Sequence, residues 1–161
     1  AAGRVSARWV TPEQAAELGA ELQACVASEV SEGRGTGTEL ELVANDLAGM
    51  PVLLVNLRVP LSTGPVFKAW DGIDRGPLPT GDLRTVALAG RNDLEGPAIS
   101  LCPGIAEVLG ALRETSAWLV RMSGSGATCF ALFDSDDAMA QAASALSASH
   151  PDWWQLAGHL R

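Results

Sequence analysis

The sequence predicts an α+β fold in which antiparallel strands form one layer and helices cover one face of it. Two apolar runs flank a Ser/Gly-rich loop between Val120 and Phe133, and a third run, Pro51–Asn56, has the length of a buried strand. Residues 104–115 repeat apolar side chains at helical spacing. The order is strand, helices, strand, strand, helix, with room for a last strand near Trp153. A split β-α-β arrangement of the ferredoxin type fits this order best.

Two further elements are predicted before the first of these strands. Thr11 followed by Pro12 has the pattern of a helix start, and we expect a helix from Pro12 to about Cys25. Residues 31–38 are polar and rich in glycine, which predicts a flexible turn. Residues 39–43 read Glu-Leu-Glu-Leu-Val, and the alternation of glutamate with leucine predicts an edge strand.

The first strand is expected to lead into a short helix and then a loop. Thr63 can cap a helix from Gly64 to Trp70, because threonine side chains accept hydrogen bonds from first-turn amides. Residues 71–82 contain three glycines and two prolines, which predicts a loop.

Two helical pieces are predicted after that loop. Asn92 and Glu95 have the spacing of a capping box at a helix start. Pro97 and Pro103 divide the residues that follow into two pieces, because proline interrupts a helix interior. The second piece is the amphipathic helix over residues 104–115.

One more helix is predicted near the C-terminus. Ser135 is expected to cap it, with two aspartates in the first turn, where the helix dipole favours negative charge. We expect the helix to end by His150, and Trp153 and Trp154 to be packing residues. Its buried face is expected to hold Met139, Ala142, Ala143 and Leu146.

The composition restricts the classes of function. Of 161 residues, 47% are hydrophobic, and the net charge of −8 disfavours nucleic acid and anionic membranes as partners. Cys25, Cys102 and Cys129 are scattered, which is typical of buried, reduced thiols, and the histidines lack metal-ligand spacing. With neither an apolar run of membrane-spanning length nor a secretion signal, we expect a cytoplasmic protein. The chain opens abruptly on Ala1, which is compatible with a piece of something longer.

The Ser/Gly-rich loop is the stretch with the clearest chemical potential. Gly124 and Gly126 allow backbone conformations that a side chain would forbid. Successive N–H groups in such a loop can form an anion-binding hollow, with Ser123 and Ser125 as extra donors. A tight turn between two strands explains the same residues, so the glycines alone leave both interpretations open. The Gly-Lys-Ser/Thr of the common P-loop is not present.

The complete string is more specific than its glycines. Residues 122–130, Met-Ser-Gly-Ser-Gly-Ala-Thr-Cys-Phe, closely resemble the third, C-terminal motif of the GHMP small-molecule kinases. Three other stretches extend the resemblance over nearly the whole chain: Val52–Phe67, Gly90–Glu95 and His150–Trp154. Among GHMP kinases, the chain looks most like those that act on 4-diphosphocytidyl-2-C-methyl-D-erythritol in the non-mevalonate isoprenoid pathway.

The resemblance implies two domains. Residues 49–161 would form the ferredoxin-like GHMP kinase C-terminal domain, and residues 1–48 the end of an N-terminal domain that is ribosomal protein S5 domain 2-like. The family's Gly-rich loop around the ATP phosphates, and its N-terminal lysine, would precede Ala1. We therefore expect this chain alone not to bind ATP productively, and a missing N-terminal half or a second chain to complete the site.

The family's catalytic aspartate is replaced by a glutamate. The string from Leu18 to Gln23, Leu-Gly-Ala-Glu-Leu-Gln, stands where the family has Leu-Gly-Ala-Asp-Val-Pro, so the resemblance assigns the general base to Glu21. Glutamate reaches roughly 1.5 Å further, and misplacement on the order of 1 Å can cost about 10²-fold in rate. A solvated helix residue is the other interpretation of Glu21. Leu57 stands where the family usually has proline, which would alter a loop that touches the substrate.

The remaining site residues are also assigned by the resemblance. Ser62, Thr63 and Phe67 stand where the family lines the pocket of the cytidine-diphosphate substrate. The Phe67 ring could stack on cytosine, or simply pack against apolar neighbours. Five residues would support the nucleotide-binding loop of the other domain: Ser123, Gly124, Ser125, Gly126 and Thr128. Magnesium would come with ATP and keep mostly phosphate and water ligands, with no protein metal site.

The implied reaction is direct, in-line phosphoryl transfer from ATP to a substrate hydroxyl, without a phospho-enzyme. A related activity, such as a homoserine or mevalonate kinase, is disfavoured by the strings Ser-Thr-x-x-Val-Phe and Asn-Asp-Leu-Glu. A non-catalytic remnant that binds a partner or a ligand is the alternative from another class. It is favoured by the absence of the ATP loop and by the glutamate at position 21.

Overall fold

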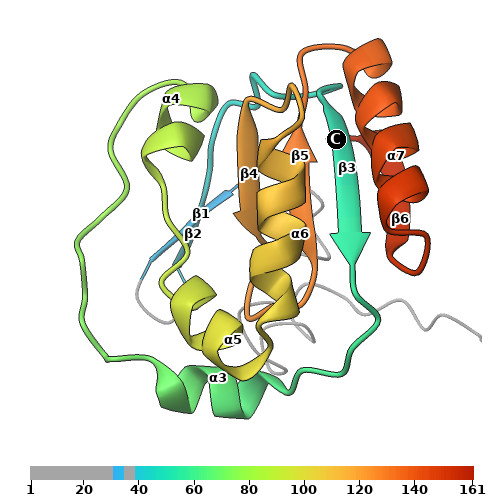
Figure 1. Cartoon of the computed structure of the whole chain (residues 1–161). Coiled ribbons are helices and arrows are strands. Elements are labelled where there is room, and N and C mark those ends of the chain that lie inside the picture. Colours follow the sequence, from blue (N-terminus) through green and yellow to red (C-terminus); the bar gives the residue numbers. More distant parts are fainter. Residues whose placement is uncertain (1–30, 35–38) are drawn as a thin grey trace, which may run out of the picture. The chain divides into compact units, whose positions relative to one another are not determined.

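The computed structural model describes residues 31–34 and 39–161 (Figure 1). It divides into two compact units, with the boundary between Asn45 and Asp46, and Arg161 counted with the first unit. The helix predicted from Pro12 to about Cys25 lies outside the described residues, as does Glu21.

The first unit contains a strand pair. β1 (Ser31–Arg34) pairs antiparallel with β2 (Glu39–Leu42), with Gly33 opposite Leu40. The edge strand predicted over residues 39–43 is thus confirmed as β2. The flexible turn predicted over residues 31–38 is wrong for its first four residues, because pairing with β2 satisfies their backbone groups whatever their side chains are.

The second unit is built on an antiparallel sheet of four strands in the order β4-β5-β3-β6. The strands are β3 (Pro51–Asn56), β4 (Leu119–Met122), β5 (Cys129–Leu132) and β6 (Trp154–His159). Helices connect β3 to β4 and β5 to β6, which is the split β-α-β topology of the ferredoxin type. The predicted fold class is therefore confirmed, and β3 lies between two neighbours, as its continuous apolar run predicts.

Five helices accompany this sheet, α3 (Thr63–Ala69), α4 (Leu83–Ala89), α5 (Glu95–Leu101), α6 (Gly104–Arg113) and α7 (Asp136–Ser149). Leu53 and Val55 of β3 are fully buried in one cluster with Ile105 of α6 and Met139 of α7. These two helices therefore cover the same face of the sheet (Figure 1). Trp153 packs against that cluster and stacks on His150 with ring centroids 3.8 Å apart, in agreement with its predicted packing role.

Helices α6 and α7 are confirmed, although Ala143, expected on the buried face of α7, is only half-buried. The Ser135 hydroxyl accepts a hydrogen bond from the Ala138 N–H at 3.2 Å, which is the expected cap of α7. Helix α4 was not predicted, because its apolar residues at helical spacing, Leu83, Val86 and Ala87, are few and only half-buried. It is set instead by its cap, since the Asp82 carboxylate accepts from the Thr85 N–H at 2.9 Å.

Two predicted capping roles are wrong. Thr63 is the first residue of α3, and its N-cap, Ser62, makes no side-chain hydrogen bond to the helix. Asn92 forms no capping box with Glu95, because the N-cap of α5 is Leu94 and the Glu95 carboxylate lies 3.5 Å from the Arg113 guanidinium. The side chains of Thr63 and Asn92 contact the Ser/Gly-rich loop instead.

Across residues 31–34 and 39–161, no helix combines the length and the apolar character that crossing a membrane would require.

Candidate functional site

The Ser/Gly-rich loop joins β4 to β5 and is closed by its own backbone. The Ser123 N–H donates to the Thr128 carbonyl at 2.8 Å, and the Gly126 N–H donates to the Ser123 carbonyl at 3.0 Å. Gly124 and Gly126 have φ values of +53° and +89°, a region that strongly favours glycine. Gly126 is also short of space, because a Cβ there would lie 3.0 Å from Met122 Sδ.

Donor groups of the loop remain available to a ligand. Within the part of the chain that the structure describes, the N–H groups of Gly124 and Ser125 have no hydrogen-bond partner, and neither does the Ser123 hydroxyl. Gly124 and Ser123 are exposed and Ser125 is half-buried. This donor set suits an anionic oxygen, such as that of a phosphate group.

Helix α3 meets the loop through a pair of hydroxyl groups. Thr63 Oγ1 lies 3.0 Å from Ser125 Oγ, and either hydroxyl can donate. The contact brings together a residue predicted to bind substrate and one predicted to support the nucleotide loop, 62 positions apart in the chain.

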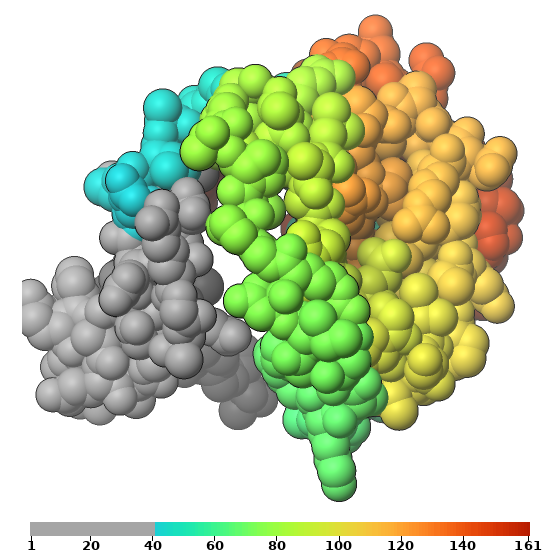
Figure 2. All heavy atoms as spheres, turned by 90° about the vertical axis from the view of Figure 1, so that its left-hand side faces the viewer, coloured from blue at the N-terminus to red at the C-terminus, as the bar shows by residue number. Residues whose placement is uncertain are grey.

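Of the other side chains of α3, some pack against the core and some are exposed to solvent. Val66 is fully buried and anchors the helix, whereas the neighbouring Phe67 ring is 50% exposed. Ser62, directly before the helix, is also exposed. Figure 2 shows α3 at the molecular surface, beside α5. The substrate roles of Ser62, Thr63 and Phe67 stay predictions.

Asn56 ties the end of β3 to the last residue of the loop. Its Nδ2 donates to the Thr128 hydroxyl at 2.8 Å, and its Oδ1 accepts from the Arg58 N–H at 2.6 Å. Leu57, which stands where the family usually has proline, packs against the buried cluster. Its Cδ1 would lie 2.9 Å from a Cβ placed on Gly104, so the two residues are in close contact.

Asn92 is a further residue at the loop. Its Nδ2 donates to the carbonyl oxygens of Met122, at 2.9 Å, and of Gly124, at 2.8 Å. The sequence offers no local signal for this contact, because the partners are 30 and 32 residues away along the chain. The capping interpretation assigned the amide to a neighbour three residues away instead.

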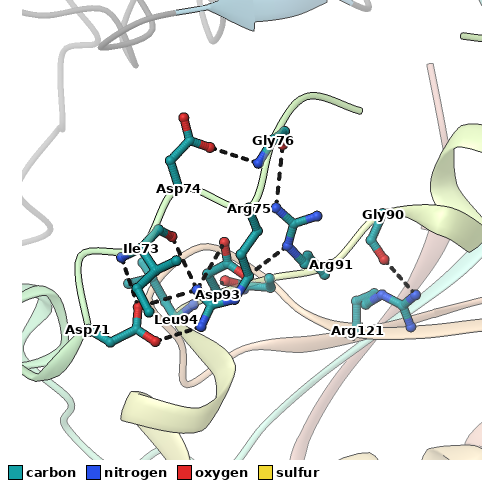
Figure 3. A network of polar contacts seen from close by, with 11 residues as sticks. Asp71, Ile73, Asp74, Arg75, Gly76, Gly90, Arg91, Asp93, Leu94 and Arg121 are labelled. Atoms are coloured by element: carbon teal, nitrogen blue, oxygen red, sulfur yellow. Dashed lines mark hydrogen bonds and ion pairs between the residues drawn. The ribbon is translucent and has the colours of Figure 1, made fainter. Parts of the chain in front are cut away.

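A charged network holds the segment after α3 (Figure 3). Arg75 donates to both carboxylate oxygens of Asp71, at 2.5 and 3.2 Å, and lies 3.8 Å from Asp93. Arg91 Nε donates to the same Asp93 at 3.0 Å. Hydrogen bonds from Arg75 hold the pKa of Asp71 below its ordinary value. An open hollow of about 400 Å³ lies beside the network, lined by Ala69, Trp70, Asp71, Arg75, Asp93, Gly96, Pro97 and Ser100.

Among the described residues, no group of three or more His, Cys, Asp or Glu side chains is arranged to hold a metal ion. The Ser/Gly-rich loop and the side chains bonded to it present hydroxyl, amide and backbone groups, whereas the charged side chains lie in the network beside the hollow. Hydroxyl, amide and N–H donors orient phosphate groups, and they supply no acid or base of their own at neutral pH.

The fold and the Ser/Gly-rich loop both agree with one family of proteins. Residues 77–152 match the family model described as GHMP kinases C terminal. The resemblance to the GHMP kinases predicted from the motifs is therefore confirmed, and the second unit has the fold of the C-terminal domain of these kinases.

More particularly, the chain is similar to 4-diphosphocytidyl-2-C-methyl-D-erythritol kinases. It is 60% identical to the enzyme of that name from Erythrobacter litoralis over 153 residues, which cover 92% of this chain and 56% of the relative. It is 62% identical to the one from Novosphingobium aromaticivorans over 148 residues, 92% of this chain and 51% of the relative.

The solved structures agree with these relatives. The crystal structure of a 4-(cytidine 5'-diphospho)-2C-methyl-D-erythritol kinase superposes with a TM-score of 0.72 at 31% identity, covering 91% of this chain and 55% of that one. The chain thus spans about half the length of the relatives it matches.

Proposed function

We propose that this chain is the C-terminal part of an ATP-dependent kinase that phosphorylates a hydroxyl group of 4-diphosphocytidyl-2-C-methyl-D-erythritol, in cytoplasmic isoprenoid-precursor biosynthesis. The observation that carries the proposal is the hydroxyl contact between Thr63 and Ser125. It joins the helix expected to face the cytidine-diphosphate substrate to the loop expected to face the nucleotide. The similarity to kinases of that name supports the same assignment.

In this proposal the two parts of the chain have different tasks. Residues 49–161 supply the exposed Phe67 ring for the cytosine, the hydroxyls of Ser62 and Thr63 for the substrate, and the loop from Ser123 to Thr128. Residues 1–48 complete the N-terminal domain and carry Glu21, which would accept the proton of the attacking hydroxyl. The free N–H groups of the loop suit the phosphate region, and magnesium would be bound there mainly by phosphate and water.

The proposal is tested by direct turnover with two proteins. Phosphorus NMR of 4-diphosphocytidyl-2-C-methyl-D-erythritol mixed with ATP and magnesium would be recorded with this chain and with the product of its complete reading frame. We expect phosphorylated substrate from a reading frame that encodes a Gly-rich phosphate loop before Ala1, and none from this chain alone. A Glu21→Gln variant of the active protein should lose turnover while still binding both ligands.

The alternative from the other class predicts a different result. If the chain is a remnant without catalysis, the protein encoded by the complete reading frame would form no ADP from ATP. The Glu21→Asp substitution would then not raise turnover. A calorimetric titration would then still show heat with the cytidine-diphosphate compound, because Phe67 and the hydroxyls of Ser62 and Thr63 are present in this chain. Inactivity of the complete product would refute the kinase proposal.

A further inference from the structure

The side chain of Asn92 is held by three hydrogen bonds. Its Nδ2 group donates to the carbonyls of Met122 and Gly124, at 2.9 and 2.8 Å. Its Oδ1 accepts from the Leu94 N–H at 3.0 Å. Both amide hydrogens are thus directed at the Ser/Gly-rich loop, and the oxygen is directed at the turn that begins α5. Asparagine suits this position because its short, neutral amide can donate two hydrogen bonds and accept others at the same time.

These bonds act on the part of the loop that has unusual backbone geometry. Met122 is the last residue of β4 and only 2% exposed, and Gly124 has a φ of +53°. The Ser123 N–H, between them, is bonded to Thr128. Three consecutive residues are therefore fixed through their backbones, which sets the directions of the free N–H groups at Gly124 and Ser125.

The residue after Asn92 connects the same turn to α3. The Asp93 carboxylate is bonded to Arg91 and lies 3.8 Å from Arg75, and Arg75 is bonded to Asp71, two positions after the end of α3 (Figure 3). The start of α3 reaches the loop directly, through Thr63 and Ser125. Both ends of α3 are thus linked to the turn at Asn92, one through the loop and one through the charged network.

We propose that Asn92 is a positioning residue for the phosphoryl transfer described above, because its amide sets the backbone of the Ser/Gly-rich loop and, through Ser125, the place of Thr63. The inference rests on the proposed function for its kinetic part and on the geometry alone for its structural part. A residue that merely capped a turn would need only the bond to Leu94, and aspartate would replace it without loss.

The isosteric variant Asn92→Asp separates these two roles. It keeps the shape and the bond to the Leu94 N–H, but places a carboxylate oxygen where two carbonyl oxygens converge. Repulsion and the loss of both donors should displace the loop. A protonated aspartate can donate once, so acidification should restore part of the native arrangement. This pH dependence is expected of the variant and not of the native chain.

The structural part is tested in this 161-residue chain by NMR. In the unmodified protein, the Asn92 NH₂ protons should exchange slowly and show scalar couplings to the Met122 and Gly124 carbonyl carbons. In Asn92→Asp, the Gly124 and Gly126 amide resonances should shift, while that of Gly158 in β6 should not. Fast exchange of the native NH₂ group, or unmoved glycine resonances, would overturn the inference, and the first measurement needs no variant to fold.

The kinetic part is tested in the catalytically active complete protein. Because displacement on the order of 1 Å can cost about 10²-fold, Asn92→Asp should lower kcat by roughly 10- to 100-fold with a smaller change in KM. Ser144→Ala is the control, since Ser144 is exposed on α7 and takes no part in the Ser/Gly-rich loop, the charged network or the hollow beside it. An unchanged kcat in Asn92→Asp would contradict the inference. An inactive unmodified protein would contradict the proposed function instead, and the NMR result would then decide the role of Asn92.

Discussion

Gly124 and Gly126 form a matched pair in one loop, and replacing each by alanine separates backbone strain from lack of space. Both glycines have positive φ, so each alanine should cost about 1–2 kcal/mol of backbone strain. At Gly124 nothing lies within 4 Å of the added Cβ. At Gly126 the added Cβ would lie 3.0 Å from Met122 Sδ, 3.2 Å from Leu61 Cδ2 and 3.3 Å from Ile105 Cδ1.

The second contribution can be estimated from these neighbours. Overpacking a close-packed site costs about 1–3 kcal/mol. The ends of Met122 and Leu61 can move by a few tenths of an ångström, whereas Ile105 is fully buried between the helices and the sheet. We therefore expect Gly126→Ala to be less stable than Gly124→Ala by about 1–2 kcal/mol, which corresponds to roughly 2–8 °C in Tm for a chain of this size.

The assay is urea unfolding of both variants, followed by tryptophan fluorescence and fitted with a common slope against urea. Equal losses of unfolding free energy would refute the reasoning, because they would mean that the space around Gly126 adapts without cost. A larger loss at Gly124 would refute it as well, since only backbone strain acts there.

Three further predictions address a binding role, an ion pair and a thiol. Phe67→Ala should weaken binding of a cytidine-diphosphate compound by roughly 5- to 160-fold, the usual contribution of a base stacked on an aromatic ring. Leu88→Ala, whose side chain is 53% exposed against 50% for Phe67, should leave the affinity unchanged, and calorimetry measures both. The Arg84 guanidinium lowers the pKa of Asp134 below its ordinary 3.8, so this pair stabilises the fold above about pH 4 and stops doing so as the pH falls through the lowered value. Asp134→Asn should therefore remove part of the acid-induced fall in Tm between pH 5 and 2, and an unchanged pH profile would contradict it. Burial raises the pKa of the Cys129 thiol to about 12, so iodoacetamide at pH 8 should leave it unmodified in the native chain and alkylate it in urea, as peptide mass spectrometry can show.

Elements that bury a periodic face could be predicted from the sequence. Helix α6 repeats its apolar residues at helical spacing, and each of Ile105, Val108, Leu109 and Leu112 is fully buried. The same holds for β3, where a short apolar run became a strand with neighbours on both sides. Helix α4 was missed because its periodic face is short and only half-buried, and because its start depends on the Asp82 cap.

The candidate site was predicted less completely than the fold. The Ser/Gly-rich loop was located by its composition, and its glycines do take up positive φ values. The residues that hold the loop were misinterpreted, since Thr63 and Asn92 were assigned to helix starts near them in the chain. Capping rules consider partners within a few residues, such as the Leu94 N–H for Asn92, whereas the loop partners of these side chains lie 62, 30 and 32 positions away.

The sequence by itself determined the central strand β3, the helices α6 and α7, and the glycine positions of the loop, because these depend on local sterics and on burial of one face. The tertiary structure alone decided which carbonyl groups the Asn92 amide would bind and which hydroxyl Thr63 would meet. A side chain carries its donors and acceptors wherever it stands, but its partners are chosen only when β4, β5 and the turn before α5 come together.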